Sequence, residues 1–503
     1  MHIYIISGSK EKIIQVEEGQ TILEAFQKNG FTDLHAPCGG RGSCGKCTVE
    51  LEGRGDVLAC MTTVRDGMRV TVDKILDGKD CVIAEEGSCY HYRTDGEAAL
   101  LAACDIGTTT VVCHLIDGKT GKKLATFSEL SAQRSFGADV LSRIQTASAG
   151  KLLLLHEQIT AQISRMLGEM IQKVKAGNRI ERLAVSGNTV MCHLLAGISP
   201  ASIGVTPFQP EEYFGNELRG EKIGIPICET IYIAPAVAGY VGGDITCDML
   251  AVMPERETRE TLVLDVGTNG EMVLGHTGSY VCCATAVGSA FEGAELTMGM
   301  PAAKGAISHV WLDARRIRVE VIGGGQAEGI CGSGLIDALS VLLQMGLLDH
   351  TGLLKQSDAV SVAYWKYLGT YRGQTCVWLT PEVCLTQEDI RDLQLAKAAF
   401  AAGIQIMLKE RKIACEQIER VVLAGGFGSY LDKESAAKIG LIPQCLLNVT
   451  ESVGNAAGEG AVSAAISAAA RNKLAELKNS MHYIELSTHP DFPECYMEQM
   501  EFR

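Results

Sequence analysis

The first 75 residues alternate apolar and polar positions over short runs that are typical of β-strands. Runs of this kind cover residues 1–6, 12–16, 47–51, 56–60 and 68–72. Between them, residues 21–30 (TILEAFQKNG) have helical spacing, Thr21 and Glu24 form a capping box, and Gly30 can end the helix. We therefore expect residues 1–75 to form a small α+β unit, with strands around one helix.

Residues 76–98 carry many charges and show no clear apolar period, so we interpret them as a linker. From residue 99 onward, apolar strand-type runs alternate with long helical runs, such as residues 152–177 and 458–478. Strands that alternate with helices predict an α/β class.

One pattern occurs twice in this larger region, about 160 residues apart. Residues 100–117 (LLAACDIGTTTVVCHLID) and 260–275 (ETLVLDVGTNGEMVLG) share an apolar run, an aspartate, a Gly-Thr turn and a second apolar run. A repeat at this distance indicates two similar subdomains and not a solenoid. We place the subdomains at residues 99–255 and 256–503, the second with a C-terminal tail.

Composition restricts the compartment and the partners. The net charge of −15 argues against a nucleic-acid partner. Nineteen cysteines in a long chain, with no signal-peptide pattern at the start, do not suggest a secreted disulfide framework. No run approaches the roughly 18 apolar residues of a membrane span. We expect a soluble, cytoplasmic protein without a membrane partner, in which most thiols are small buried hydrophobic groups.

Four of the cysteines stand apart from the rest. Cys38, Cys44, Cys47 and Cys60 have the spacing C-x5-C-x2-C-x12-C, with glycines at 39, 40, 42 and 45. Four thiolates can hold zinc or an iron–sulfur cluster, and zinc sites usually have two C-x2-C pairs. Three cysteines on one glycine-rich loop with a distant fourth favour a 2Fe–2S cluster, because the loop can direct N–H groups at the sulfurs. Zinc and unligated thiols remain alternatives.

This loop resembles that of the ferredoxin family, although its first gap is one residue longer than in the plant-type pattern. The resemblance implies a β-grasp ferredoxin-like unit. Such a unit transfers one electron at a time and performs no bond chemistry by itself.

The two repeated turns, Asp105–Thr110 and Asp265–Gly270, suit a polyphosphate. A tight turn of small residues exposes backbone N–H groups that can bind phosphate oxygens, and the hydroxyls of Thr108, Thr109 and Thr268 can add donors. The two aspartates can orient Mg²⁺ and its water molecules, because hard cations prefer carboxylate oxygens.

A third glycine-rich segment follows an apolar strand at residues 420–432 (RVVLAGGFGSYLD). Together the three segments resemble the acetate and sugar kinase, heat-shock chaperone and actin superfamily. The resemblance implies a duplicated RNase H-like ATPase that binds ATP between its halves. It also implies two phosphate loops and an adenosine loop, with these cofactor-binding residues: Gly107, Thr108, Thr109, Thr110, Gly267, Thr268, Asn269, Gly270, Gly425, Gly426 and Phe427.

The same resemblance assigns catalytic or metal-orienting roles to Asp105, Asp265 and Asp244. Residues 233–246 and 454–465 resemble the two connecting helices of that superfamily, and the first would bring Asp244 near the phosphates. An alternative interpretation is that Asp244 only caps its helix at Ile245.

Two other glycine-containing segments do not satisfy known phosphate motifs. Gly118-Lys119-Thr120 resembles the end of a P-loop, but position 113 is Cys where that motif needs Gly. Gly323, Gly325 and Gly329 are spaced one residue too widely for a dinucleotide fingerprint. Residues 330–334 predict instead a helix N-terminus, with Gly332 and Ser333, that lines the ATP cleft.

A one-electron carrier joined to an ATP site suggests that ATP drives an electron to a lower potential, where each 59 mV corresponds to about 1.4 kcal/mol. The combination resembles the reductive activators of corrinoid proteins along nearly the whole chain. Segments that carry this resemblance are DIGTTT, QRSFGADVLSRI, SGNTVMCHLLAGISP, LDVGTNGEM, AFEGAELTMGM, ICGSGLIDAL and LAGGFGS.

That resemblance implies an ATP-hydrolysing enzyme that reduces the Co(II) corrinoid of a methyltransferase partner to Co(I). It further implies an upstream low-potential electron donor, a homodimer, and a position of the segment around Ser289 toward the corrinoid partner. Alternatives are an ATP-driven donor to another low-potential enzyme such as a dehydratase, a small-molecule kinase with a regulatory cluster, and an ATP-regulated chaperone or scaffold.

Overall fold

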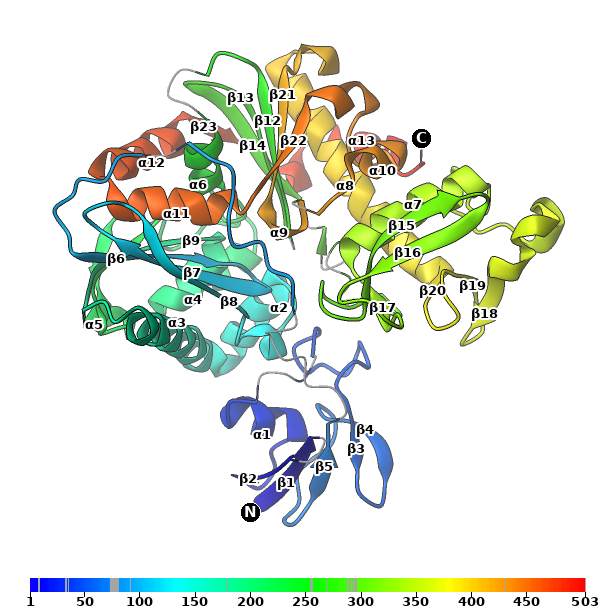
Figure 1. Cartoon of the computed structure of the whole chain (residues 1–503), viewed down its shortest axis with the longest axis horizontal. Coiled ribbons are helices and arrows are strands. Elements are labelled where there is room, and N and C mark those ends of the chain that lie inside the picture. The colour runs from blue at the N-terminus through cyan, green and yellow to red at the C-terminus, as the bar shows by residue number, and fades with distance from the viewer. Residues whose placement is uncertain are drawn as a thin grey trace.

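The structure is a computed structural model of the chain. It describes all residues except 8–9, 32–33, 35, 73–80, 91, 178, 254–256, 268, 286, 289–290, 292, 294–295, 429 and 503, and the side chain of residue 10. In the view of Figure 1 a small N-terminal unit lies at the bottom, one larger sheet lies above it, and a second larger sheet lies at the top, with helices between and around the two larger sheets.

The N-terminal unit is a five-stranded sheet of order β2-β1-β5-β3-β4 with one helix. Its elements are β1 (His2–Ser7), β2 (Lys10–Gln15), α1 (Ile22–Lys28), β3 (Thr48–Leu51), β4 (Gly55–Leu58) and β5 (Arg69–Thr71). β1 pairs antiparallel with β2 and parallel with β5. Thr21 and Glu24 form the predicted capping box at the start of α1. The expected β-grasp arrangement is confirmed.

Two six-stranded sheets follow, and five strands of each share one topology. The first has the order β10-β11-β9-β6-β7-β8 and the second β22-β21-β12-β13-β14-β23. The first sheet contains β6 (Leu100–Ile106), β7 (Thr110–Asp117), β8 (Lys123–Leu130), β9 (Ile180–Gly187), β10 (Glu217–Arg219) and β11 (Cys228–Ile233). The second contains β12 (Thr261–Val266), β13 (Gly270–His276), β14 (Ser279–Thr285), β21 (Arg420–Ala424), β22 (Thr450–Gly454) and β23 (Met481–Tyr483). The sixth strands lie at opposite edges, β10 antiparallel beside β11 and β23 parallel beside β14.

Each sheet begins with three antiparallel strands, and two parallel strands extend it on the other side of the first strand. This shared order confirms the predicted duplication of an RNase H-like subdomain. β6 and β12 are central strands buried on both faces, which explains their nearly continuous apolar sequences.

Three helices lie between the two sheets (Figure 1): α6 (Gly243–Val252), α11 (Ala456–Ile466) and α12 (Ala468–Ser480). Their apolar side chains join Leu101 of the first sheet and Val263 of the second in one core. α11 therefore connects the C-terminal region to the first subdomain. On the outer faces, α3 (Leu152–Val174) and α4 (Thr189–Ala196) cover the first sheet, and α8 (Gln387–Arg411) covers the second.

An insertion between β14 and α8 forms the side lobe of Figure 1. It contains β15 (Ala306–Asp313), β16 (Arg316–Val321), β17 (Gly329–Ile330), α7 (Gly332–Met345), β18 (Leu368–Tyr371), β19 (Gln374–Trp378) and β20 (Cys384–Thr386). In the part of the chain that the structure describes, no helix combines the length and apolar character needed to cross a membrane.

Candidate functional site

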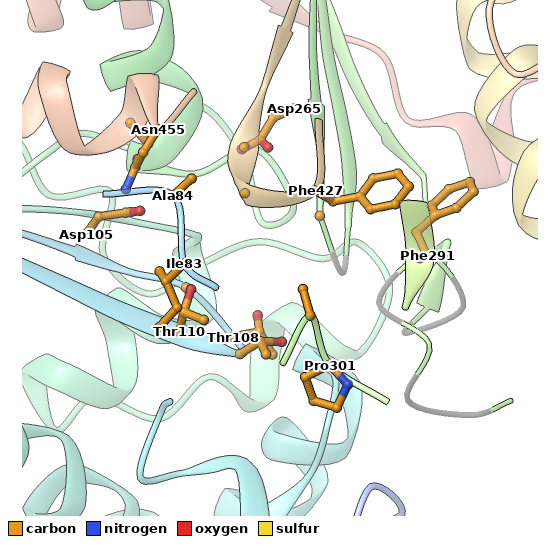
Figure 2. Close-up of a pocket in the computed structure, with 18 of the residues that line it drawn as sticks. Ile83, Ala84, Asp105, Thr108, Thr110, Asp265, Phe291, Pro301, Phe427 and Asn455 are labelled. Atoms are coloured by element: carbon orange, nitrogen blue, oxygen red, sulfur yellow. The ribbon is translucent and has the colours of Figure 1, made fainter. Parts of the chain in front are cut away.

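A cavity of about 250 Å³ lies between the two subdomains, and the predicted nucleotide segments converge on it (Figure 2). Both repeated turns, the start of α7 and the glycine loop after β21 contribute to its wall. The predicted residues that line it are Asp105, Gly107, Thr108, Thr109, Thr110, Asp244, Asp265, Gly267, Asn269, Gly332, Ser333, Gly425, Gly426 and Phe427.

Two predicted residues are not among those just named, for different reasons. Thr268 lies outside the described residues. Gly270 does not line the cavity, because it is the first residue of β13 and pairs with Val266 and Thr285. A Cβ atom at Gly270 would lie 2.7 Å from the Phe400 ring and from the Thr285 hydroxyl. Gly270 is therefore required by packing, and its assignment as a cofactor contact stays a prediction.

The first turn joins β6 to β7 as a tight hairpin. The Gly107 N–H donates to the Thr110 carbonyl at 2.8 Å, and a Cβ at Gly107 would lie 2.9 Å from that oxygen. The Asn188 side-chain amide donates to the Thr108 hydroxyl at 3.2 Å. The turn is thus fixed from β6 on one side and from the start of α4 on the other.

The second turn follows β12 in the same way, with the Gly267 N–H bonded to the Asn269 carbonyl at 3.1 Å. Asp265 at the end of β12 pairs in register with Ala424 at the end of β21. The next residue, Gly425, has a φ of +83°, and a Cβ there would lie 2.1 Å from Asp265 Oδ1. Only glycine allows the loop to pass the carboxylate at this distance.

Four carboxylates line the cavity: Asp105, Asp244, Asp265 and Glu271. Burial, and after it the neighbouring Asp244 carboxylate, raise the pKa of Asp105 to about 7. Burial and the charges of Asp244 and Asp105 raise the pKa of Asp265 to about 8. Burial, followed by Asp244 and Asp265, also holds the pKa of Glu271 well above its usual value.

These shifts have a clear chemical meaning. Like charges that share a poorly hydrated site favour protonation, whereas a divalent cation would favour the ionised forms. The carboxylates therefore fit a Mg²⁺ ion that arrives with a polyphosphate. Sequence analysis missed Glu271, although its position directly after the GTNG turn was a usable signal.

Asp244 lies in the first turn of α6, where its carboxylate accepts the Ile245 N–H at 2.9 Å. Burial raises the pKa of Asp244 to about 6, while the backbone N–H groups around it oppose the rise. The carboxylate also faces the cavity. The N-cap of α6 is Gly242, without a side-chain cap hydrogen bond, so Asp244 is a residue of the first turn that bonds one free N–H and also lines the cavity.

An aromatic wall closes the cavity opposite Asp105 and Thr108 (Figure 2). The rings of Phe427 and Phe291 stack with centroids 5.6 Å apart and planes inclined by 19°. Sequence analysis missed Phe291, which lies in the segment around Ser289. Ser289 itself is outside the described residues, but Phe291 is buried and lines the cavity.

Helix N-termini add positive potential around the cavity. Gly332 and Ser333 begin α7, and Asn455, whose side chain accepts the Gly458 N–H, caps α11. All three residues line the cavity. Because helix N-termini favour negative charge, they complement phosphate groups.

The segment predicted as a linker contributes to the site directly. We call residues 81–90 the strap. Its first part, Cys81–Ala84, lines the cavity, and the N–H of Val82 donates to Ala302 O at 2.6 Å. Farther along, the Ser88 N–H donates to the Val453 carbonyl at 2.7 Å. The described part of this segment is thus fixed to the larger part of the chain, which sequence analysis did not predict.

The four cysteines of the glycine-rich loop face one another in the N-terminal unit. Cys38, Cys47 and Cys60 are buried and Cys44 is half-buried. The Sγ atoms of Cys38 and Cys44 lie 3.3 Å apart, and Cys60 forms a side-chain hydrogen bond with Cys47. Burial raises the pKa of Cys38, but hydrogen bonds from Cys44, Gly40 and Ser43 outweigh it and lower the pKa to about 6.

This arrangement fits a binuclear cluster. Backbone N–H groups of Gly40 and Gly42 point at the sulfurs of Cys38 and Cys60, as expected for a site that carries negative charge. The thiols are paired two and two, which suits two iron atoms. Among the described residues, no three His, Cys, Asp or Glu side chains are placed to hold a single metal ion.

Comparison with known proteins agrees with both halves of the site. Three protein-family models match the chain: a 2Fe–2S iron–sulfur cluster binding domain at residues 11–74, the RACo middle region at residues 100–256, and the C-terminal ASKHA domain of RACo at residues 259–503.

Whole-chain relatives agree with these matches. The chain is 30% identical to the corrinoid activation enzyme RamQ of Eubacterium limosum, over 98% of each chain. It is 26% identical to the [Co(II) methylated amine-specific corrinoid protein] reductase of Methanosarcina barkeri, over 68% of this chain and 65% of that one. A solved structure titled reductive activator for corrinoid,iron-sulfur protein has a TM-score of 0.72 at 26% identity, covering 99% of this chain and 98% of that chain. The chain therefore belongs to the family of reductive activators of corrinoid proteins.

Proposed function

We propose that this protein is an ATP-dependent enzyme that passes one electron from a 2Fe–2S cluster to the Co(II) corrinoid of a methyltransferase partner and so restores Co(I). The observation that carries the proposal is the presence, on one chain, of a paired four-cysteine loop and a cavity built from two repeated phosphate turns. A kinase would need only the cavity, and a ferredoxin would need only the loop.

In the N-terminal unit, the thiolates of Cys38, Cys44, Cys47 and Cys60 would hold the 2Fe–2S cluster, which supplies a one-electron centre when bound. The backbone N–H groups of the loop stabilise negative charge on the sulfurs, and burial of three of the four thiols limits contact with water. Both effects influence the reduction potential of the site.

In the cavity, the two turns would bind the phosphates of ATP through their backbone N–H groups, with the hydroxyls of Thr108 and Thr109 as further donors. Asp105 and Asp265 would orient Mg²⁺ and its water molecules, and Asp244 lies where it can assist them. The stacked Phe427 and Phe291 rings offer an apolar surface for the adenine base.

Hydrolysis of ATP then supplies the free energy for an unfavourable electron transfer. Binding of the nucleotide between two subdomains stabilises one arrangement of the subdomains over another. The relatives act on corrinoid proteins according to their names, and we assign a corrinoid protein as the partner here. An upstream low-potential electron donor, a homodimer and a cytoplasmic location complete the proposal.

An anaerobic single-turnover experiment tests this function. Reduced protein is mixed with a Co(II) corrinoid protein, and the absorbance of Co(I) is followed with Mg–ATP or with a non-hydrolysable analogue. We expect Co(I) with ATP and none with the analogue. Cys44→Ala should abolish Co(I) formation but keep nucleotide binding, whereas Asp265→Ala should keep the cluster but lose ATP dependence. Phosphate transfer to a small acceptor, without Co(I), would support the kinase alternative and contradict the proposal.

A further inference from the structure

One short segment lies between the nucleotide cavity and the cysteine loop. We call residues 133–143 the relay segment; it includes the 3₁₀ turn η2 (Arg134–Phe136) and the start of α2 (Val140–Thr146). Arg134 and Ala138 line the nucleotide cavity. The next residue, Asp139, lines a second cavity of about 720 Å³ together with Cys38 and Cys44. Neighbouring residues of one turn thus face the two functional sites.

On the nucleotide side, the link is a fully buried arginine. The guanidinium of Arg143 donates to the carbonyl oxygen of Thr108, in the first phosphate turn. It also donates to the Gly137 carbonyl at 3.1 Å and to the Gln133 side-chain oxygen at 3.4 Å. A buried charge is costly to leave unpaired. Movement of the phosphate turn therefore requires the relay segment to move with it.

On the cluster side, the relay segment contacts both the cysteine loop and α1. The Ala138 N–H donates to the Pro37 carbonyl at 3.0 Å. The side-chain amide of Gln27, a buried residue of α1, donates to the Ser135 carbonyl at 2.6 Å. Gly39 lies against the same turn, since a Cβ at Gly39 would be 2.8 Å from the Phe136 carbonyl oxygen. Pro37 and Gly39 flank the ligand candidate Cys38.

We propose that the relay segment couples nucleotide binding to the redox state of the cluster, with Arg143, Gln27 and Gly39 as the positioning residues. Coupling of this kind is reciprocal: if the nucleotide binds the reduced and oxidised forms with different affinities, it shifts the reduction potential by the same free energy. A tenfold difference in affinity corresponds to about 59 mV for one electron. The inference rests on the proposed occupants of the two sites.

The loop supplies a matched pair of variants. Gly39 and Gly45 have φ values of +66° and +65°, so alanine meets similar backbone strain at both positions. Each glycine is adjacent to one of the cysteines of the loop. A Cβ at Gly39 would press against the relay segment, whereas a Cβ at Gly45 would meet no atom within 4 Å. Gly39→Ala therefore perturbs the contact, and Gly45→Ala controls for strain in the loop.

The experiment measures the dissociation constant of Mg–ADP for the cluster-loaded protein, once oxidised and once reduced with dithionite. For the natural protein and Gly45→Ala we expect the two constants to differ at least about fivefold, within the usual range of allosteric coupling. For Gly39→Ala we expect them to agree within about twofold, with unchanged iron content. Mg–ADP should also shift the midpoint potential of the cluster in the natural protein and in Gly45→Ala, but not in Gly39→Ala.

Several results would overturn the inference. The first is an equal Mg–ADP dissociation constant for the oxidised and reduced natural protein. The second is a difference between these constants that persists in Gly39→Ala, and the third is a difference that is lost in Gly45→Ala as well. If Gly39→Ala fails to retain iron, Gln27→Met replaces it, because that variant removes the bond to Ser135 and keeps the side-chain volume. If the natural protein failed to bind Mg–ADP or failed to hold the cluster, the proposed function itself would be contradicted. If it bound both but the two did not influence each other, only the proposed role of the relay segment would be contradicted.

Discussion

The buried carboxyl group of Asp265 should lower the free energy of unfolding of the nucleotide-free protein at pH 7. Asp265→Asn should therefore raise that free energy. The pKa of this carboxyl group is raised to about 8 in the folded chain, chiefly by burial and by Asp244 and Asp105, against about 3.9 in an unfolded chain. At pH 7 the folded state retains a proton that the unfolded state has lost. Stability therefore falls as the pH rises from about 4 towards 8.

The size of the effect follows from the same two values. Three pH units lie between the unfolded pKa and pH 7, and each corresponds to about 1.4 kcal/mol, which gives at most about 4 kcal/mol. Asp105 and Asp244 share part of this penalty, because protonation of one carboxylate relieves the others. We therefore expect Asp265→Asn to raise the free energy of unfolding by roughly 2–4 kcal/mol at pH 7 and by little at pH 4.

Urea unfolding of the nucleotide-free protein, followed by tryptophan fluorescence, measures this difference. All three tryptophans, Trp311, Trp365 and Trp378, lie in the same C-terminal region as Asp265. Asp358→Asn, at an exposed residue of that region, is the matched control and should change stability by less than about 0.5 kcal/mol. A destabilised Asp265→Asn protein, or a gain that does not shrink towards pH 4, would refute the reasoning.

Four further predictions concern the two sites. Cys44→Ala should remove the visible absorbance of the cluster while calorimetry shows unchanged Mg–ATP binding. Gly425→Ala should weaken Mg–ATP binding at least about tenfold, because its Cβ would displace Asp265, whereas Gly278→Ala, which has a similar φ of +85° away from the cavity and whose Cβ would meet no atom within 4 Å, should bind normally. Phe427→Ala should lower the affinity for ATP by about 1–2 kcal/mol but leave the affinity for inorganic triphosphate unchanged; an equal loss for both ligands would exclude a base contact. Binding of Mg–ATP at pH 7 should release protons from the carboxylates, so the calorimetric enthalpy should depend on the ionisation enthalpy of the buffer, and a buffer-independent enthalpy would contradict the raised pKa values.

Local sequence patterns were sufficient where the structure depends on local chemistry. The capping box of Thr21 and Glu24 specifies where α1 begins, because both bonds lie within four residues. The repeated Asp-x-Gly-Thr turns predict the duplicated sheets, because the same order of strand, turn and strand recurs about 160 residues later in the chain. Both features are confirmed in the structure.

Other parts of the site depend on contacts that leave little trace in the sequence. The strap is held by backbone groups such as the N–H of Val82, and any residue except proline can supply that bond. Arg143 occupies a helical position where an arginine usually faces water, and only the tertiary fold buries it. Phe291 reaches the cavity because the neighbouring residue 332 is a glycine. A Cβ at Gly332 would lie 1.6 Å from the Phe291 carbonyl oxygen.

The central claim is that ATP drives the electron to a potential at which it would not remain otherwise. The most direct measurement holds the protein and a Co(II) corrinoid protein at a fixed ambient potential with a redox buffer, and records the ratio of Co(I) to Co(II) with and without Mg–ATP. The account predicts a ratio above the Nernst value only while ATP is being hydrolysed, and a return to that value when ATP is exhausted. A ratio that equals the Nernst value under both conditions would contradict it.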